Sequence, residues 1–133
     1  MKMNKAAVKR MIARIERVPE AYDQSAWYVE TDRSTPCGTV ACLAGEAVIC
    51  ATPNEPAGIR RAIRLLRDGG IVDAANKVLG LSGRESPNVY TSNAGSWPMP
   101  HGKWYAKAKT HKARARVAVA YLREALERGT MLW

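Results

Sequence analysis

The sequence lacks any apolar run near the roughly 20 residues that a membrane-spanning helix needs, which argues against a transmembrane protein. It also lacks an unbroken apolar segment at its amino terminus, because charged residues interrupt MKMNKAAVKRMIARIE, and a secretory signal is not expected. The 133 residues, of which 47% are hydrophobic, instead fit one compact domain over 1–133.

Cysteines and cofactor motifs are also scarce. Three cysteines cannot all pair within one molecule, so we expect free thiols in a reducing cytoplasm. The HExxH zinc helix, the phosphate-binding Walker loop and the GxGxxG dinucleotide loop are all missing. We therefore expect no cofactor.

Acidic residues are few relative to basic ones. Asp and Glu number 12 against 21 Lys and Arg, which gives a net charge of +9. Such an excess creates a positive field that attracts polyanions, and nucleic acid is the leading candidate. Solvated surface charge without a partner explains the same composition.

Hydrophobic periodicity predicts an all-α fold of about five helices around a central apolar helix. On the first helix we expect Arg14 to lie with Arg10 and Arg17 away from the apolar stripe. A long ordered loop is expected from Ser82 to Lys103, and a short extended piece near 27–29. The expected helices span 4–18, the segment opened by Gly38 or Thr39, 57–68, 71–79 and 104–128.

Four stretches carry a resemblance to a known family. They are Tyr22-Asp23-Gln24-Ser25-x-Trp27, Cys37-Gly38-Thr39-x-x-Cys42-x-Ala44-Gly45, Leu79-Gly80-Leu81 and Trp97-Pro98. The chain resembles, over roughly 8–128, a family of small uncharacterised proteins from bacteria and their phages. The resemblance implies one mostly helical domain and no established activity. Glu46 stands where an aromatic residue is common in the family, and it argues against a fully buried helix at that turn.

The cysteine motif allows three interpretations. Cys37 just before a helix would feel the positive end of the helix dipole, which favours a nucleophilic thiolate with His101 or His111 as its base. A zinc site would need Cys37, Cys42, His101 and His111, but their spacing is unusual for zinc. In the third interpretation the segment is core packing, with Cys42 buried and Thr39 capping the helix.

The region before and within the last expected helix combines aromatic and basic residues. Bases stack on aromatic rings while lysines contact phosphates, so the pattern suits single-stranded nucleic acid. Alternatively, Trp97 and Trp104 fill the core and the cations form a solvated face. The aromatic residues are Tyr90, Trp97, Trp104 and Tyr105, and the cations are Lys103, Lys107, Lys109, Lys112, Arg114 and Arg116.

A second basic surface is expected on the helix over 57–68. Its apolar positions Ile59, Ile63 and Leu66 should be buried. Arginine binds phosphate and carboxylate bidentately, so RNA, a nucleotide or an acidic protein would fit equally. The outward-facing arginines are Arg60, Arg61, Arg64 and Arg67.

The residues together favour a non-enzymatic protein that binds a polyanion, with nucleic acid first, through its Lys and Arg surfaces. The alternative is an accessory protein of a phage or bacterium that binds and modulates a host protein. A cysteine-dependent hydrolase or transferase built on Cys37 ranks third. The oligomeric state is left open by the sequence.

Overall fold

A computed structural model describes residues 3–19, 28–30, 39–41, 43–81 and 97–131. For 28–30, 39–41 and Leu66 it describes the backbone, and for the other residues in these ranges it also describes the side chains. Apart from one short two-stranded ladder, the described residues form an all-α domain with six helices. The elements are α1 (Lys5–Arg17), β1 (Tyr28–Glu30), β2 (Thr39–Ala41), α2 (Leu43–Ala51), α3 (Glu55–Asp68), α4 (Ile71–Leu79), α5 (His101–Lys107) and α6 (His111–Arg128).

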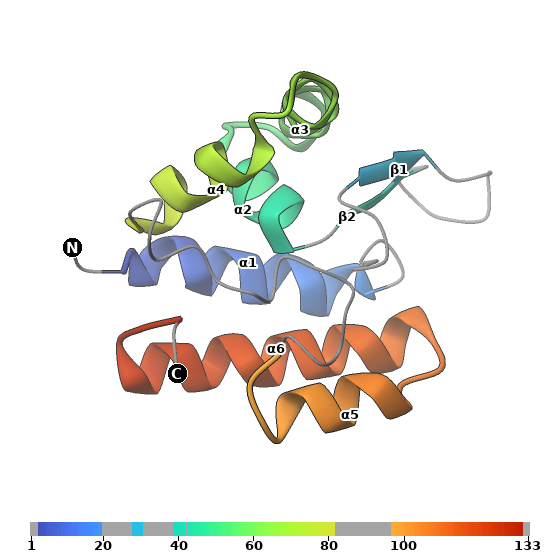
Figure 1. The fold of residues 1–133 in the computed structure, drawn as a ribbon. Helices are drawn as coiled ribbons and strands as arrows, with labels where there is room; N and C mark the ends of the chain where they lie inside the picture. Colours follow the sequence, from blue (N-terminus) through green and yellow to red (C-terminus); the bar gives the residue numbers. More distant parts are fainter. Residues whose placement is uncertain (1–2, 20–27, 31–38, 42, 82–96, 132–133) are drawn as a thin grey trace.

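The helices pack in layers. The principal contacts run from α3 to α2, from α2 to α1, from α1 to α6 and from α6 to α5, while α4 packs on α2 (Figure 1). Consequently α3 and α5 lie at opposite ends of this series, with the other layers between them. The two strands pair antiparallel, with Val29 opposite Val40.

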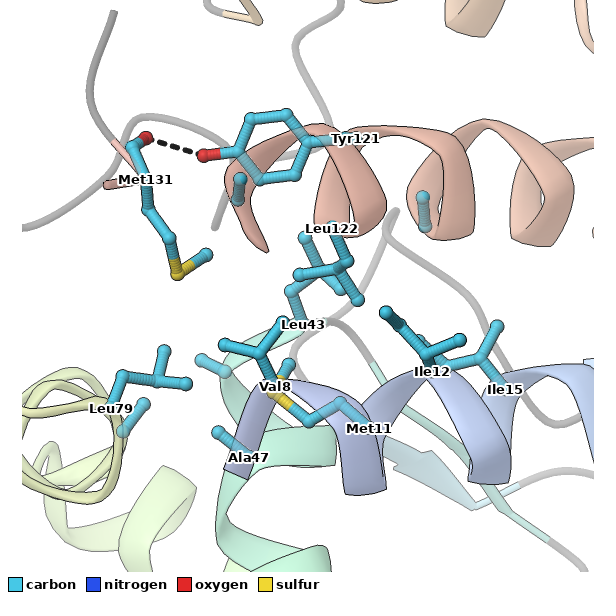
Figure 2. Close-up of a cluster of buried hydrophobic side chains, with 14 of the residues drawn as sticks. Val8, Met11, Ile12, Ile15, Leu43, Ala47, Leu79, Tyr121, Leu122 and Met131 are labelled. Atoms are coloured by element: carbon cyan, nitrogen blue, oxygen red, sulfur yellow. Dashed lines mark hydrogen bonds between the residues drawn. The ribbon is translucent and has the colours of Figure 1, made fainter. Parts of the chain in front are cut away.

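Helix α2 is at the centre of the α1 to α4 half, as its apolar sequence predicts. Every residue from Leu43 to Ile49 is buried, and Leu43 and Ala47 meet the apolar stripe of α1, including Val8 and Met11 (Figure 2). Continuous burial of this kind explains why the helix is apolar nearly all round.

Local signals set most of the helix ends. The side chain of Asn4 accepts a hydrogen bond from the backbone N–H of Ala7 at the start of α1. Gly80 and Gly129 end α4 and α6 in the left-handed conformation, with φ of 73° at each, a backbone that glycine adopts without a steric penalty. Pro56 lies in the first turn of α3, where its missing N–H costs nothing.

Helix α3 approaches α2 more closely than the expected apolar contacts suggest. Ile59 and Ile63 are only half-buried, whereas Gly58 and Ala62 are buried. A Cβ atom at Gly58 would lie 2.8 Å from the backbone oxygen of Ile49, which is a clash. Gly58 therefore makes the close contact with α2, while Ile59 and Ile63 are partly buried against the core, as predicted. The side chain of Leu66 lies outside the described part.

Two predicted boundaries were also wrong. The central helix does not begin at Gly38 or Thr39, because 39–41 forms β2 and α2 begins at Leu43. The helix expected over 104–128 is two helices, since Ala108 is extended and the Thr110 side chain caps α6 by accepting from the Ala113 N–H. The loop expected to reach Lys103 therefore ends earlier, and its residues 82–96 lie outside the described part.

The chain end folds back on α6. Met131 is buried, and the hydroxyl of Tyr121 donates a hydrogen bond of 2.5 Å to its backbone oxygen (Figure 2). Burial raises the pKa of Tyr121 above its ordinary value, so the hydroxyl remains a donor. The end of the described chain therefore packs on its own domain at Met131.

Candidate functional site

Helix α5 is held on α6 by an aromatic cluster. The ring of Trp97 stacks on Tyr105 with centroids 4.6 Å apart, and it meets Tyr121 edge to face at 5.6 Å. All three side chains are buried. Trp97 and Tyr105 are therefore core residues, which confirms the core alternative for Trp97 and removes both from the base-stacking candidates.

His101 provides a second attachment of α5. Its Nε2 lies 3.1 Å from the Oε2 of Glu124 on α6, and its ring meets Tyr121 edge to face. Burial lowers the pKa of His101, although the Glu124 carboxylate opposes this shift. Burial therefore favours the neutral imidazole at this position.

Trp104 has the opposite environment to Trp97. It is 47% exposed, and its ring and the His101 ring meet edge to face with centroids 5.1 Å apart. Lys103 and Lys107, also exposed, fall within the same arc of α5 as Trp104 by helical spacing. We call Lys103, Trp104, Lys107 and the exposed Lys109 that follows the helix the α5 face.

The cations of α6 form a different group. Lys112 and Arg116 line a cleft of about 330 Å³ between α1 and α6, with Ile15 and Val119 among its apolar lining residues. Arg114 is half-buried elsewhere on the helix. The six cations predicted as one surface therefore divide into the three lysines of the α5 face, the two cations of this cleft, and Arg114 apart from both.

The predicted cations share one electrostatic property. No carboxylate in the described part of the chain lies within ion-pair distance of Lys103, Lys107 or Lys109. The same holds for Lys112, Arg114 and Arg116. The sequence explains this, because it contains no Asp or Glu between Glu85 and Glu124.

The α3 arginines are arranged as predicted. All four are exposed, and none has a carboxylate within ion-pair distance among the described residues. We call Arg60, Arg61, Arg64 and Arg67 the α3 face. It lies at the other end of the helix layers from the α5 face (Figure 1).

Arg14 differs from every other arginine of the described chain, and its predicted exposure was wrong. It is 6% exposed, and its Nη1 lies 2.5 and 2.6 Å from the two carboxylate oxygens of Glu46. Its Nη2 reaches Glu55 on α3 at 3.4 Å, and Arg17 holds the other oxygen of Glu55 at 2.9 Å. The cluster joins α1, α2 and α3.

Glu46 is fully buried, so the expectation of an exposed turn in α2 was also wrong. Burial raises the pKa of Glu46 to about 7, although the Arg14 guanidinium opposes the shift. The available signal was a single carboxylate in the apolar segment LAGEAVICA, since a buried charge requires a partner of opposite sign.

The cysteines predicted as nucleophile or zinc ligands, Cys37 and Cys42, lie outside the described residues, so these interpretations stay predictions. Cys37 precedes β2 in the sequence and does not directly precede α2, which begins at Leu43. Cys50 is half-buried and free, and burial, with the Glu46 carboxylate, raises its pKa to about 12. A thiol of that pKa is protonated and weakly nucleophilic at neutral pH.

Two further observations bear on class. Within the described residues, no three His, Cys, Asp or Glu side chains are grouped as metal ligands, and no described helix is long and apolar enough to cross a membrane.

Comparisons with family models, curated proteins and solved structures found no match to this chain. The resemblance based on the cysteine motif therefore stays a prediction.

Proposed function

We propose that this chain is a non-enzymatic protein that binds single-stranded nucleic acid through the α5 face, in a reducing cytoplasm. The observation that carries the proposal is an exposed tryptophan, Trp104, flanked by exposed lysines that no described carboxylate neutralises. Stacking of a base on a tryptophan contributes about 1–3 kcal/mol and does not depend on sequence.

The anchoring of α5 supports this use of Trp104. His101 and Tyr105 fix the helix against α6, so the indole is presented from a supported backbone rather than from a free loop. An aromatic side chain whose helix is already ordered loses less entropy when a base stacks on it. The lysines at 103 and 107 would contact the phosphates on either side of that base.

Because the predicted cations do not form one surface, a strand bound at the α5 face would contact fewer phosphates than the sequence suggested. If the α5 face alone binds, its three lysines predict a log–log salt slope of about 2 for a single strand, and all six predicted cations would give about 4. Titration of labelled dT and rU oligonucleotides at several salt concentrations measures this slope.

A pair of alanine variants tests the proposal directly. Trp104→Ala should weaken oligonucleotide binding by about 5- to 150-fold, the equivalent of one lost stacking contact. Met99→Ala is the matched control, because Met99 is the other exposed large apolar side chain of the described residues, at 68% exposure. Equal affinity in Trp104→Ala and the unmodified protein contradicts the proposal.

The second candidate is binding of a host protein. Its specific support is that Met99 and Trp104 are both exposed and lie within six residues of each other, and apolar side chains anchor protein interfaces. The control separates the two functions. Loss of a captured protein in both variants, with no oligonucleotide binding by the unmodified chain, favours the host protein.

A further inference from the structure

We propose that the α3 face is a second nucleic-acid site, so that one molecule bridges two strands. This inference rests on the proposed function, since the first strand occupies the α5 face. The second occupant is the phosphate backbone of another strand, held without base recognition.

The arginine spacing supports a backbone ligand. Arg60, Arg64 and Arg67 recur at intervals of four and three residues, which places their Cα atoms along one side of α3 at steps of about 6 and 4.5 Å. Arg61 widens the row on the same exposed side. Guanidinium groups in such a row can each engage a phosphate bidentately.

The described carboxylates near α3 do not form ion pairs with its row of arginines. At the start of α3, Glu55 is occupied by Arg17 and Arg14. Asp68 at the end of α3 and Asp73 on the neighbouring α4 are exposed, but neither lies within ion-pair distance of an α3 arginine. The positive charge of the row is therefore available to a ligand.

The chemistry of the face favours a phosphate backbone over a protein. Protein interfaces are anchored by buried aromatic or aliphatic side chains. The described side chains of α3 include no exposed large apolar residue, because the two such residues of the described chain are Met99 and Trp104. Cations alone suffice for a phosphate backbone, whose binding is driven by counterion release.

The arrangement of the helices makes the two sites independent. The α3 face and the α5 face are separated by α2, α1 and α6 (Figure 1). Packed helix axes lie about 8–10 Å apart, so this separation exceeds the Debye length of about 8 Å at physiological salt. Two strands bound at the two faces would repel each other little.

The experiment is a two-strand capture. Biotinylated dT30 on beads binds the protein, excess protein is washed away, and fluorescent dT30 is then added. The test variant carries Arg→Gln at 60, 61, 64 and 67. The matched control carries Gln at Lys5, Lys9, Arg10 and Lys77, which are exposed on α1 and α4 and remove the same charge.

The unmodified protein and the control variant should capture equal amounts of the second strand. The α3 variant should bind the first strand with an affinity within about threefold of the unmodified protein, and it should capture at least tenfold less of the second strand. Circular dichroism checks the fold, and the pair Arg60→Gln and Arg64→Gln serves if the fourfold variant unfolds. Light scattering determines whether bridging comes from a dimer, which would persist in the α3 variant.

Equal capture by the α3 variant overturns the inference, and so does an unmodified protein that binds one strand and never a second. Failure of the unmodified protein to bind the first strand is a different result. It contradicts the proposed function itself.

Discussion

Arg14 on α1 and Arg64 on α3 lie at interior positions of two amphipathic helices, yet their environments are opposite. Arg14 is buried and bonded to carboxylates from α2 and α3. Arg64 is exposed, with no carboxylate within ion-pair distance in the described chain. The same side chain therefore has a structural role in one region and is available to a ligand in the other.

The comparison shows that the cations behind the net charge of +9 differ in whether a carboxylate neutralises them. Among the described cations that pair, Arg123 meets Glu16 and Arg128 meets Glu124, so only part of the charge on α1 and α6 is neutralised locally. The α3 and α5 faces carry cations without a carboxylate partner among the described residues, as do Lys112, Arg114 and Arg116 on α6. Binding of a polyanion should depend on such cations rather than on the total charge.

The largest expected effect on stability comes from replacing Arg14, the buried one of the two arginines. Arg14→Met leaves Glu46 without its partner inside the protein and should lower the free energy of unfolding by about 3–5 kcal/mol. Arg64→Met, at an exposed and unpaired position, should change it by less than about 0.5 kcal/mol. Urea unfolding at pH 8, where Glu46 would otherwise be ionised, measures both.

The double variant Arg14→Met with Glu46→Leu tests whether the instability of Arg14→Met comes from the unpaired buried charge or from the changed packing. Replacing both charges by apolar side chains of similar size should restore most of the stability, because no charge then remains buried. Equal destabilisation by Arg14→Met and Arg64→Met would show that burial does not separate the two arginines.

The pH dependence of stability gives the next largest effect. Burial raises the pKa of Glu46 from 4.5 to about 7, so between these values the folded state holds a proton that the unfolded state has lost. Stability from this group is present below pH 4.5 and is lost as the pH rises through 7, by about 3 kcal/mol at 1.36 kcal/mol per unit.

Glu46→Gln keeps the shape and removes the titration, so the unfolding free energy of the unmodified protein minus that of Glu46→Gln should fall as the pH rises through 7. The groups that act on Glu46 are Arg14, Glu55 and Arg17, and all remain in the variant. A difference that rises with pH would mean that Arg14 holds the carboxylate ionised in the fold.

Much of the fold could be predicted because its signals are local. The stripe of Val8, Met11 and Ile15 defines one face of α1, and Gly80 and Gly129 mark helix ends by their own backbone preference. The division between α5 and α6 was missed although Thr110 is a normal N-cap residue, because the residues before it, 106–109, are alanines and lysines, which are good helix formers.

The site was less predictable because it depends on contacts between distant residues. Arg14 and Glu46 are 32 positions apart, and no periodicity indicates that one reaches the other. Trp97 lies before α5 and Trp104 within it, and α5 has only seven residues, too few for a helical pattern to show that Trp104 is exposed while Tyr105 is buried. Pairing of cations was not predictable from local composition either, since Arg123 pairs with Glu16, 107 positions away.

The smallest expected effect compares two exposed cations that differ in pairing. Lys107→Gln and Arg123→Gln should each change stability by less than about 1 kcal/mol, since surface charges contribute little. Lys107 has no carboxylate partner among the described residues, so its loss should reduce the salt slope of single-strand binding by about 0.7. Arg123 is already neutralised by Glu16 at 2.9 Å, and its variant should keep the slope. Equal reductions in the two variants would show that pairing with a carboxylate does not decide which cations bind.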